Sequence, residues 1–197
     1  VIVPEELVLL MDTMGEEVDY NDINAKKVRL FNQYCSKVQP ALSGTKVSLK
    51  ASDVVKDLKR KSEWLFNHIR NQEKVEVDGK TWFNGYYDNN GERVEGNING
   101  NIRMTLTGQV FPLMSGLANE EEIQGVSQAV KKYLKDPELG GYRLNSDFGV
   151  DSYLSLGRAF GFAYGTKENG AFFSHMAVMY AFGLYANGFV EDGYDVL

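Results

Sequence analysis

Apolar residues recur every three or four positions along most of the chain, and this spacing constrains the fold more than any other feature of the sequence. Residues at this spacing lie on one face of an α-helix, which can pack against a second helix. The pattern predicts helices over 5–11, 22–38, 52–69, 110–117, 120–134 and 174–185. No regular alternation of strands with helices supports a parallel sheet. We therefore expect a mainly α fold built from paired helices.

Local signals indicate where several of these helices begin and end. Asp22 is suited to the N-cap of the second helix, and Ser174 to the N-cap of the last one. The three glutamates at 120–122 favour a first turn, because negative charge is stabilised at a helix N-terminus. Gly15 and the Asn187–Gly188 pair are predicted to end the first and the last helix.

The middle of the chain departs from the helical pattern. Val75–Val77 and Thr81–Phe83 flank Asp78–Gly79, which predicts a small β-hairpin. Loops are predicted over 39–50, 96–101 and 136–170. A loop as long as the last is typically functional or disordered, and its many aromatic residues argue against disorder.

Charge and length exclude several kinds of partner. The 197 residues carry 21 Lys and Arg against 27 Asp and Glu, a formal charge of −6, so no nucleic-acid partner is expected. No apolar run approaches the roughly 20 residues that cross a bilayer, so we expect no membrane partner and a cytoplasmic location. Cys35 is the single cysteine, and no metal-ligand spacing surrounds it. We therefore expect no disulfide and no metal.

His175 is the first candidate for a binding role. Because it follows Ser174, it is predicted in the first turn of the last helix, where backbone N–H groups and the helix dipole favour an anion such as phosphate. A neutral imidazole can also donate a hydrogen bond to a phosphate oxygen. The alternative is that His175 only packs against its neighbours.

Other polar and aromatic residues suit a carbohydrate site. Residues 82–88 combine aromatic rings, which stack on a sugar ring, with Asn and Asp, which bind its hydroxyls; a hairpin packed on its own aromatics is the alternative. Lys167 and Glu168 lie in a glycine-bounded loop and could equally form an exposed ion pair. Gln109 stands at the head of a helix, where capping explains it as well as ligand binding does.

Three sequence elements occur in an order that resembles a known family. They are W-x-x-x-Y-x-D-x-x-G at 82–91, T-G-Q-V-x-x-x-x-S-G-x-A at 107–118 and K-E-N-G-x-x-x-S-H at 167–175. This order resembles glycoside hydrolase family 94, which includes cellobiose and chitobiose phosphorylases, cyclic β-1,2-glucan synthase phosphorylase domains and 1,2-β-oligoglucan phosphorylases. The resemblance covers residues 60–197, and the third element is the most specific.

The resemblance implies both a fold and a reaction. Residues 1–197 would form part of an (α/α)6 barrel, the six-hairpin toroid of this family. The implied reaction is inverting phosphorolysis, in which a β-linked gluco-oligosaccharide or disaccharide and phosphate give α-glucose 1-phosphate and a shortened sugar. Phosphate is then a co-substrate, and no cofactor is implied.

The resemblance also assigns roles to single residues. His175 would contact phosphate, Glu168 and Lys167 would hold sugar hydroxyls, and Gln109 would line the donor site. Three residues of the first element would shape the wall of the site: Trp82, Tyr86 and Asp88.

One element of the family is missing from the sequence. The family's general acid is an Asp in an Asp-Trp-Asn-Asp-like motif, which nothing here matches, and we expect this acid upstream of Val1 in a longer parent polypeptide. A glycine- and threonine-containing phosphate loop, expected downstream, is also absent. The chain alone is therefore expected to be inactive. Two alternatives stay open, a glycoside hydrolase on the same toroid and a noncatalytic carbohydrate-binding relic of it.

Overall fold

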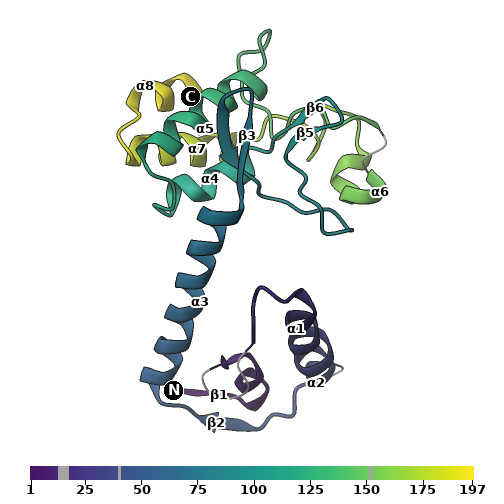
Figure 1. Ribbon diagram of the computed structural model, residues 1–197, viewed down its shortest axis with the longest axis vertical. Coiled ribbons are helices and arrows are strands. Elements are labelled where there is room, and N and C mark those ends of the chain that lie inside the picture. Colours follow the sequence, from purple (N-terminus) through teal and green to yellow (C-terminus); the bar gives the residue numbers. More distant parts are fainter. Residues whose placement is uncertain (13–17, 40, 151–152) are drawn as a thin grey trace. The chain divides into compact units, whose positions relative to one another are not determined.

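The computed structural model describes residues 1–12, 18–39, 41–150 and 153–197 and is mainly helical (Figure 1). It divides into two compact units, Val1–Phe66 and Asn67–Leu197, where the sequence analysis expected part of a single domain. Gly15, the predicted end of the first helix, lies outside the described residues.

The first unit combines short helices with a two-stranded sheet. A 3-10 helix at Glu5–Leu10 is followed by α1 (Ile23–Lys27), a π-helical segment at Val28–Cys35 and α2 (Ser36–Val38). These last three run on from one another, which confirms the helix predicted over 22–38. The predicted cap is also confirmed, because the Asp22 side chain accepts hydrogen bonds from the N–H groups of Asn24 and Ala25.

The sheet of the first unit was not predicted. β1 (Ile2–Pro4) pairs antiparallel with β2 (Lys46–Ser48), inside the predicted loop 39–50. Each strand has only three residues, which is too short for an alternating pattern to stand out in the sequence.

The long helix α3 (Ala51–Gln72) confirms the prediction for 52–69 but not its buried face. Three apolar side chains at helical spacing in this segment are about half exposed, at 49% for Val55, 55% for Leu58 and 52% for Leu65, whereas Ile69 packs against the core of the second unit. The buried residue of this helix is Asp57, whose carboxylate binds the Lys61 ammonium group at 2.5 Å. Periodicity shows which residues share a face, but whether another element covers that face depends on the rest of the fold.

In the second unit, which begins at Asn67 within α3, the predicted hairpin follows this helix. β3 (Lys74–Val77) pairs antiparallel with β4 (Lys80–Phe83). The two turn residues, Asp78 and Gly79, both have positive φ, at 51° and 68°. This turn geometry matches the right-handed twist of the strands, which is why an Asp-Gly pair is favoured there.

A second hairpin replaces the loop predicted over 96–101. β5 (Gly96–Ile98) pairs with β6 (Asn101–Arg103), and Asn99 and Gly100 form the turn with φ of 55° and 84°. An Asn-Gly pair is a strong hairpin signal. The prediction failed because the strands on either side are polar and only three residues long.

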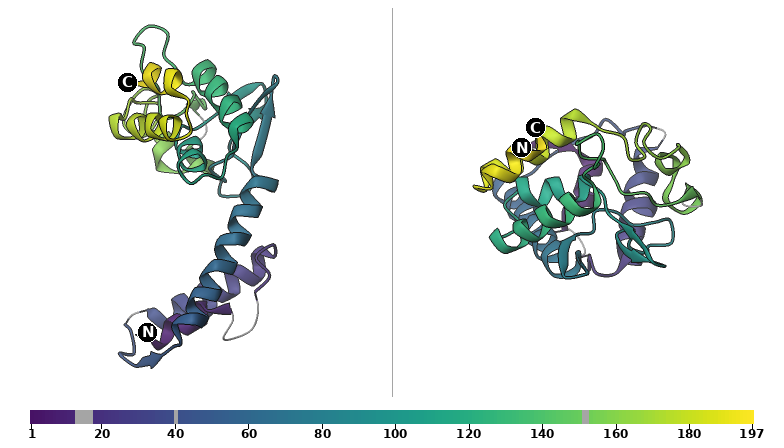
Figure 2. Two further views of the ribbon diagram at one scale, coloured as in Figure 1. Left: turned by 90° about the vertical axis from the view of Figure 1, so that its left-hand side faces the viewer. Right: turned by 90° about the horizontal axis from the view of Figure 1, so that it is seen from above.

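The remaining α-helices of the second unit are α4 (Thr107–Met114), α5 (Glu120–Tyr133), α6 (Tyr153–Leu156), α7 (Ser174–Ala186) and α8 (Val190–Val196), and a 3-10 helix at Arg158–Gly161 follows α6. Asn119 and Glu122 form a reciprocal capping box at the start of α5. Helix α7 packs on α4 and α8, and α5 packs on β4 (Figure 2). The core between them contains the buried side chains of Trp82, Val110, Val126, Val130 and Leu184.

Two features of the helices bear on the sequence predictions. Phe173, rather than Ser174, takes the N-cap position of α7, without a side-chain hydrogen bond to the helix. Among the described residues, no helix combines the length and the apolar character that a bilayer span requires.

Candidate functional site

The loop that carries Lys167 and Glu168 exposes Lys167 to solvent, whereas Glu168 is partly buried and its Oε2 atom is buried without a hydrogen-bond partner among the described residues. Glu168 Oε1 accepts a hydrogen bond from Arg158 Nη2 at 2.6 Å. The backbone N–H of Glu168 itself and the Arg158 guanidinium lower the pKa of this carboxyl below its ordinary value. Lys167 has a left-handed backbone, with φ of 46°, and its Nζ lies 4.7 Å from the centre of the Phe162 ring. The loop thus offers a carboxylate and two cations near one another.

His175 is the second residue of α7, so the prediction that it lies in the first turn of this helix is confirmed. The residue is exposed, and its ring centre lies 5.6 Å from that of Phe173. An exposed imidazole beside the N–H groups of a first turn is suited to an anion. Its contact with phosphate stays a prediction.

Tyr86 is connected to Glu168 indirectly, through the segment 156–158. The Tyr86 hydroxyl donates to the carbonyl of Leu156 at 2.7 Å, and Gly157 separates Leu156 from Arg158, the ion-pair partner of Glu168. Tyr86 also lies against Phe160, with ring centres 6.5 Å apart. The structure therefore pairs Arg158 with Glu168 and anchors Tyr86 to the backbone two residues before Arg158. The sequence analysis missed Arg158, because nothing in the local sequence indicates which carboxylate it pairs with.

Trp82 and Gln109 are located differently from their predicted positions at the wall of a sugar site. Both side chains are fully buried, at 0% exposure. The Trp82 ring packs against Tyr133, with ring centres 5.7 Å apart. The Gln109 amide donates to the Phe83 carbonyl at 2.8 Å and accepts from the Phe83 N–H at 2.9 Å. Neither side chain presents a surface to a ligand in this structure, because both join β4 to the core.

Asp88 holds a turn. Its Oδ1 accepts hydrogen bonds from the N–H groups of Asn90 at 2.8 Å and Glu92 at 2.9 Å. These bonds, the one from Glu92 foremost, lower the pKa of the Asp88 carboxyl. The charge therefore stabilises the turn that follows Tyr86, and its predicted contact with sugar stays a prediction.

Glu95 is a buried carboxyl that the sequence analysis missed. It accepts hydrogen bonds from Gly85 N at 3.0 Å, from Thr105 N at 3.0 Å and Oγ1 at 2.7 Å, and from Gln109 Nε2 at 3.2 Å. Burial raises its pKa to about 7. Glu95 thus joins the segment that leads to Tyr86 to the start of α4. A single Glu between Val94 and Gly96 gives no sequence signal of this role.

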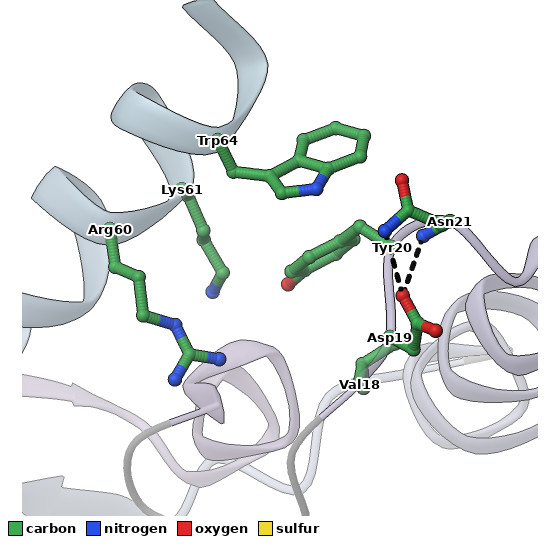
Figure 3. A pocket seen from close by; sticks show the side chains of 7 residues that line it. All are labelled: Val18, Asp19, Tyr20, Asn21, Arg60, Lys61 and Trp64. Carbon is green, nitrogen blue, oxygen red and sulfur yellow. Dashed lines mark hydrogen bonds between the residues drawn. The ribbon is translucent and has the colours of Figure 1, made fainter. Parts of the chain in front are cut away.

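The first unit contains a separate cavity of about 330 Å³. Figure 3 shows Arg60, Lys61 and Trp64 of α3 on one side and Tyr20 on the other, with ring centres of Tyr20 and Trp64 5.4 Å apart. Its cations have acidic neighbours: Lys61 binds Asp57, and Arg60 Nη2 lies 4.0 Å from Asp12 Oδ2. The cavity has no surplus positive charge for phosphate, and none of the predicted site residues lines it. Within the described ranges, no three His, Cys, Asp or Glu side chains are grouped as ligands of a metal ion.

Comparison with known proteins agrees with the resemblance seen in the sequence. Residues 46–188 match the catalytic domain of the Glycosyl hydrolase 94 superfamily, a range that encloses all the predicted site residues. A solabiose phosphorylase from Paenibacillus borealis is 31% identical over 127 residues, which are 64% of this chain and 16% of that protein. The aligned part is thus a small share of the relative's length. The chain belongs to the glycosyl hydrolase 94 superfamily.

Proposed function

We propose that this chain is part of an inverting glycoside phosphorylase that acts on a β-glucoside and releases α-glucose 1-phosphate. The observation that carries the proposal is segment 167–175, which lies inside the family match and combines an exposed Lys167, a partly buried Glu168 and an exposed first-turn His175. The relative named a phosphorylase supports the same class of reaction.

The chemistry of phosphorolysis requires few groups from this part of the protein. A phosphate oxygen attacks the anomeric carbon, the glycosidic C–O bond breaks, and its electron pair leaves with the glycosidic oxygen, which takes a proton from a carboxylic acid. Phosphate is already an anion and needs no general base. It needs hydrogen-bond donors, which His175 and the N–H groups of the first turn of α7 supply in this proposal. Glu168 and Lys167 bind sugar hydroxyls.

The proposal assigns the remaining groups to the rest of a parent polypeptide. The sequence contains no match to the motif of the family's general acid, so the acid is proposed to come from another segment. The helices of the second unit are proposed to form part of an (α/α)6 barrel with that segment. No cofactor besides the co-substrate phosphate is required.

Phosphate binding is tested on this chain by NMR of its two histidines. Titration with inorganic phosphate is expected to shift the imidazole signals of His175, whereas His68, which lies 3.3 Å from Glu73 in a different part of the unit, serves as the internal control. His175→Ala, followed through the backbone amides of α7 in ¹H–¹⁵N spectra, is expected to abolish saturable binding. Equal shifts of both histidines, or no shift of His175, would contradict the phosphate assignment.

Turnover distinguishes the proposed reaction from its alternatives. The longer parent polypeptide is incubated with β-linked gluco-disaccharides, with and without phosphate, and the formation of glucose 1-phosphate is measured. Release of sugar only with phosphate is expected. Equal release without phosphate would identify a hydrolase, and oligosaccharide binding without any turnover would identify a noncatalytic protein.

A further inference from the structure

The loop that carries Lys167 and Glu168 has a closed backbone geometry. The Gly165 N–H donates to the Asn169 carbonyl at 2.7 Å, so the two ends of the loop meet. Lys167 lies at the tip in the left-handed region, with φ of 46°, which is unfavourable for a residue with a side chain. Such a conformation persists only where the surrounding structure enforces it.

Asn145 holds one end of this loop from inside the protein. The residue is buried, and its Oδ1 accepts from the Gly170 N–H at 2.8 Å while its Nδ2 donates to Asn169 Oδ1 at 3.0 Å. The Tyr164 hydroxyl donates to the Asn145 carbonyl at 3.1 Å. One amide side chain thus contacts two consecutive residues of the loop.

Arg143 holds the same end through the Gly170 carbonyl, which accepts from Arg143 Nη1 at 2.8 Å. The other edge of the guanidinium donates from Nε at 2.9 Å and from Nη2 at 2.6 Å to Asp136 Oδ2. The guanidinium also lies over two aromatic rings, with Cζ 5.3 Å from the centre of Tyr164 and 4.6 Å from that of Phe172. The planar guanidinium of an arginine has several donors in fixed directions and can make all of these contacts at once, whereas the ammonium group of a lysine cannot.

Gly170, at this end of the loop, has no space for a side chain. A Cβ at Gly170, where φ is 70°, would lie 2.2 Å from Cε2 of Tyr164. The ring that stacks on Arg143 therefore also fixes the path of the backbone. From Gly170 the chain reaches the first turn of α7, with His175, within a few residues.

We infer that Arg143 is a positioning residue: Asp136, Tyr164 and Phe172 hold its guanidinium group, which binds the Gly170 carbonyl and thereby sets the orientation of Lys167 and Glu168 toward the sugar and of the approach to His175. This inference rests on the proposed function. Arg143 acts through the loop and does not touch the ligand.

The test uses Arg143→Lys, which keeps the charge but loses the planar fork. Hydrogen exchange of the Gly165, Asn169 and Gly170 amides is expected to become at least tenfold faster. Binding of inorganic phosphate and of a β-linked gluco-disaccharide, followed in ¹H–¹⁵N spectra, is expected to weaken at least tenfold. Asp136→Asn is a milder change, because its side-chain oxygen can still accept from the N–H groups of Glu138 and Leu139. It is also expected to speed exchange of the loop amides and to weaken binding of both ligands.

Arg93→Lys is the matched control. Arg93 also contacts a backbone carbonyl, that of Lys74 at 3.4 Å, and a carboxylate, that of Glu73 at 3.8 Å, but not this loop. Arg93→Lys is expected to leave the exchange rates of the loop amides and the affinities for phosphate and disaccharide unchanged. Circular dichroism checks that all variants are folded.

Different results would contradict the positioning role of Arg143 and the proposed function. Unchanged exchange of the loop amides in Arg143→Lys would overturn the positioning role, and so would faster exchange with unchanged affinities. If the wild-type chain binds neither inorganic phosphate nor the gluco-disaccharide, the proposed function is contradicted. The inferred effect of Arg143 on ligand binding is then contradicted as well, even if hydrogen exchange shows that Arg143 holds the loop.

Discussion

At the scale of single residues, Glu95 links the stability of the second unit to pH. Its carboxyl has a pKa of about 7 in the folded protein, raised by burial from an ordinary value of 4.5. Between these two values the folded state keeps a proton that the unfolded state has released. The free energy of unfolding therefore falls as pH rises through this window, by about 3 kcal/mol in total.

Glu95→Gln should remove this part of the pH dependence. The variant cannot ionise, so its free energy of unfolding in urea, measured from pH 4.5 to 7.5, is expected to lose the downward slope. It should also be less stable overall, because a Gln Nε2 in place of Glu95 Oε2 would face two donors, Thr105 N and Gln109 Nε2. Glu76→Gln, at an exposed position of β3, should keep the wild-type slope. The same slope in Glu95→Gln as in wild type would contradict the assignment.

Residue roles were predictable where the signal is local. The cap at Asp22 and the first-turn position of His175 follow from neighbours in the sequence, and both agree with the structure. The burial of Trp82 and Gln109 depends on helices that lie far along the chain. An aromatic or amide side chain has the same identity in a core and in a sugar site, so sequence alone could not distinguish them.

At the scale of elements, helix α5 owes its sharp start to the capping box. Asn119 Oδ1 accepts from the Glu122 N–H at 2.9 Å, and Glu122 Oε2 accepts from the Asn119 N–H at 2.8 Å. Asn119→Ala leaves a helix N–H without its acceptor and is expected to lower the free energy of unfolding by about 1 kcal/mol, measured by urea denaturation. Gln124→Ala, at an exposed position of the same helix, should change it by less than about 0.5 kcal/mol. Equal effects of the two substitutions would show that the cap contributes nothing.

Long elements were predicted better than short ones. The confirmed helices α3, α5 and α7 have several turns, and the β3–β4 hairpin has an Asp-Gly turn between apolar strands, whereas the four-residue helix α6 lies in a segment predicted as loop. The three-residue strands β1, β2, β5 and β6 carry too few side chains for a period of two to show. Their pairing is decided by which segments the fold brings together.

At the scale of the whole molecule, the two compact units differ in what stabilises them. Among the described residues of the first unit, the buried apolar side chains are Val18 and Leu49, whereas the second unit contains a continuous core around Trp82 and Leu184. Burying a Val or Leu side chain contributes about 1.5–3 kcal/mol. The first unit relies more on polar contacts such as that of Lys61 with Asp57, and partly exposed ion pairs contribute little after desolvation.

This difference predicts that the two units open at different free energies. Backbone amides of residues 1–66 are expected to exchange with solvent at least tenfold faster than those of α4, α5 and α7, because fewer buried contacts oppose local unfolding there. Hydrogen–deuterium exchange followed by mass spectrometry at neutral pH measures both sets in one sample, so the second unit serves as the internal reference. Val126→Ala, in the core of the second unit, should speed exchange in α4, α5 and α7 and leave residues 1–66 unchanged. Uniform protection along the chain, or a core substitution that loosens both units equally, would show instead that the molecule unfolds as one cooperative body.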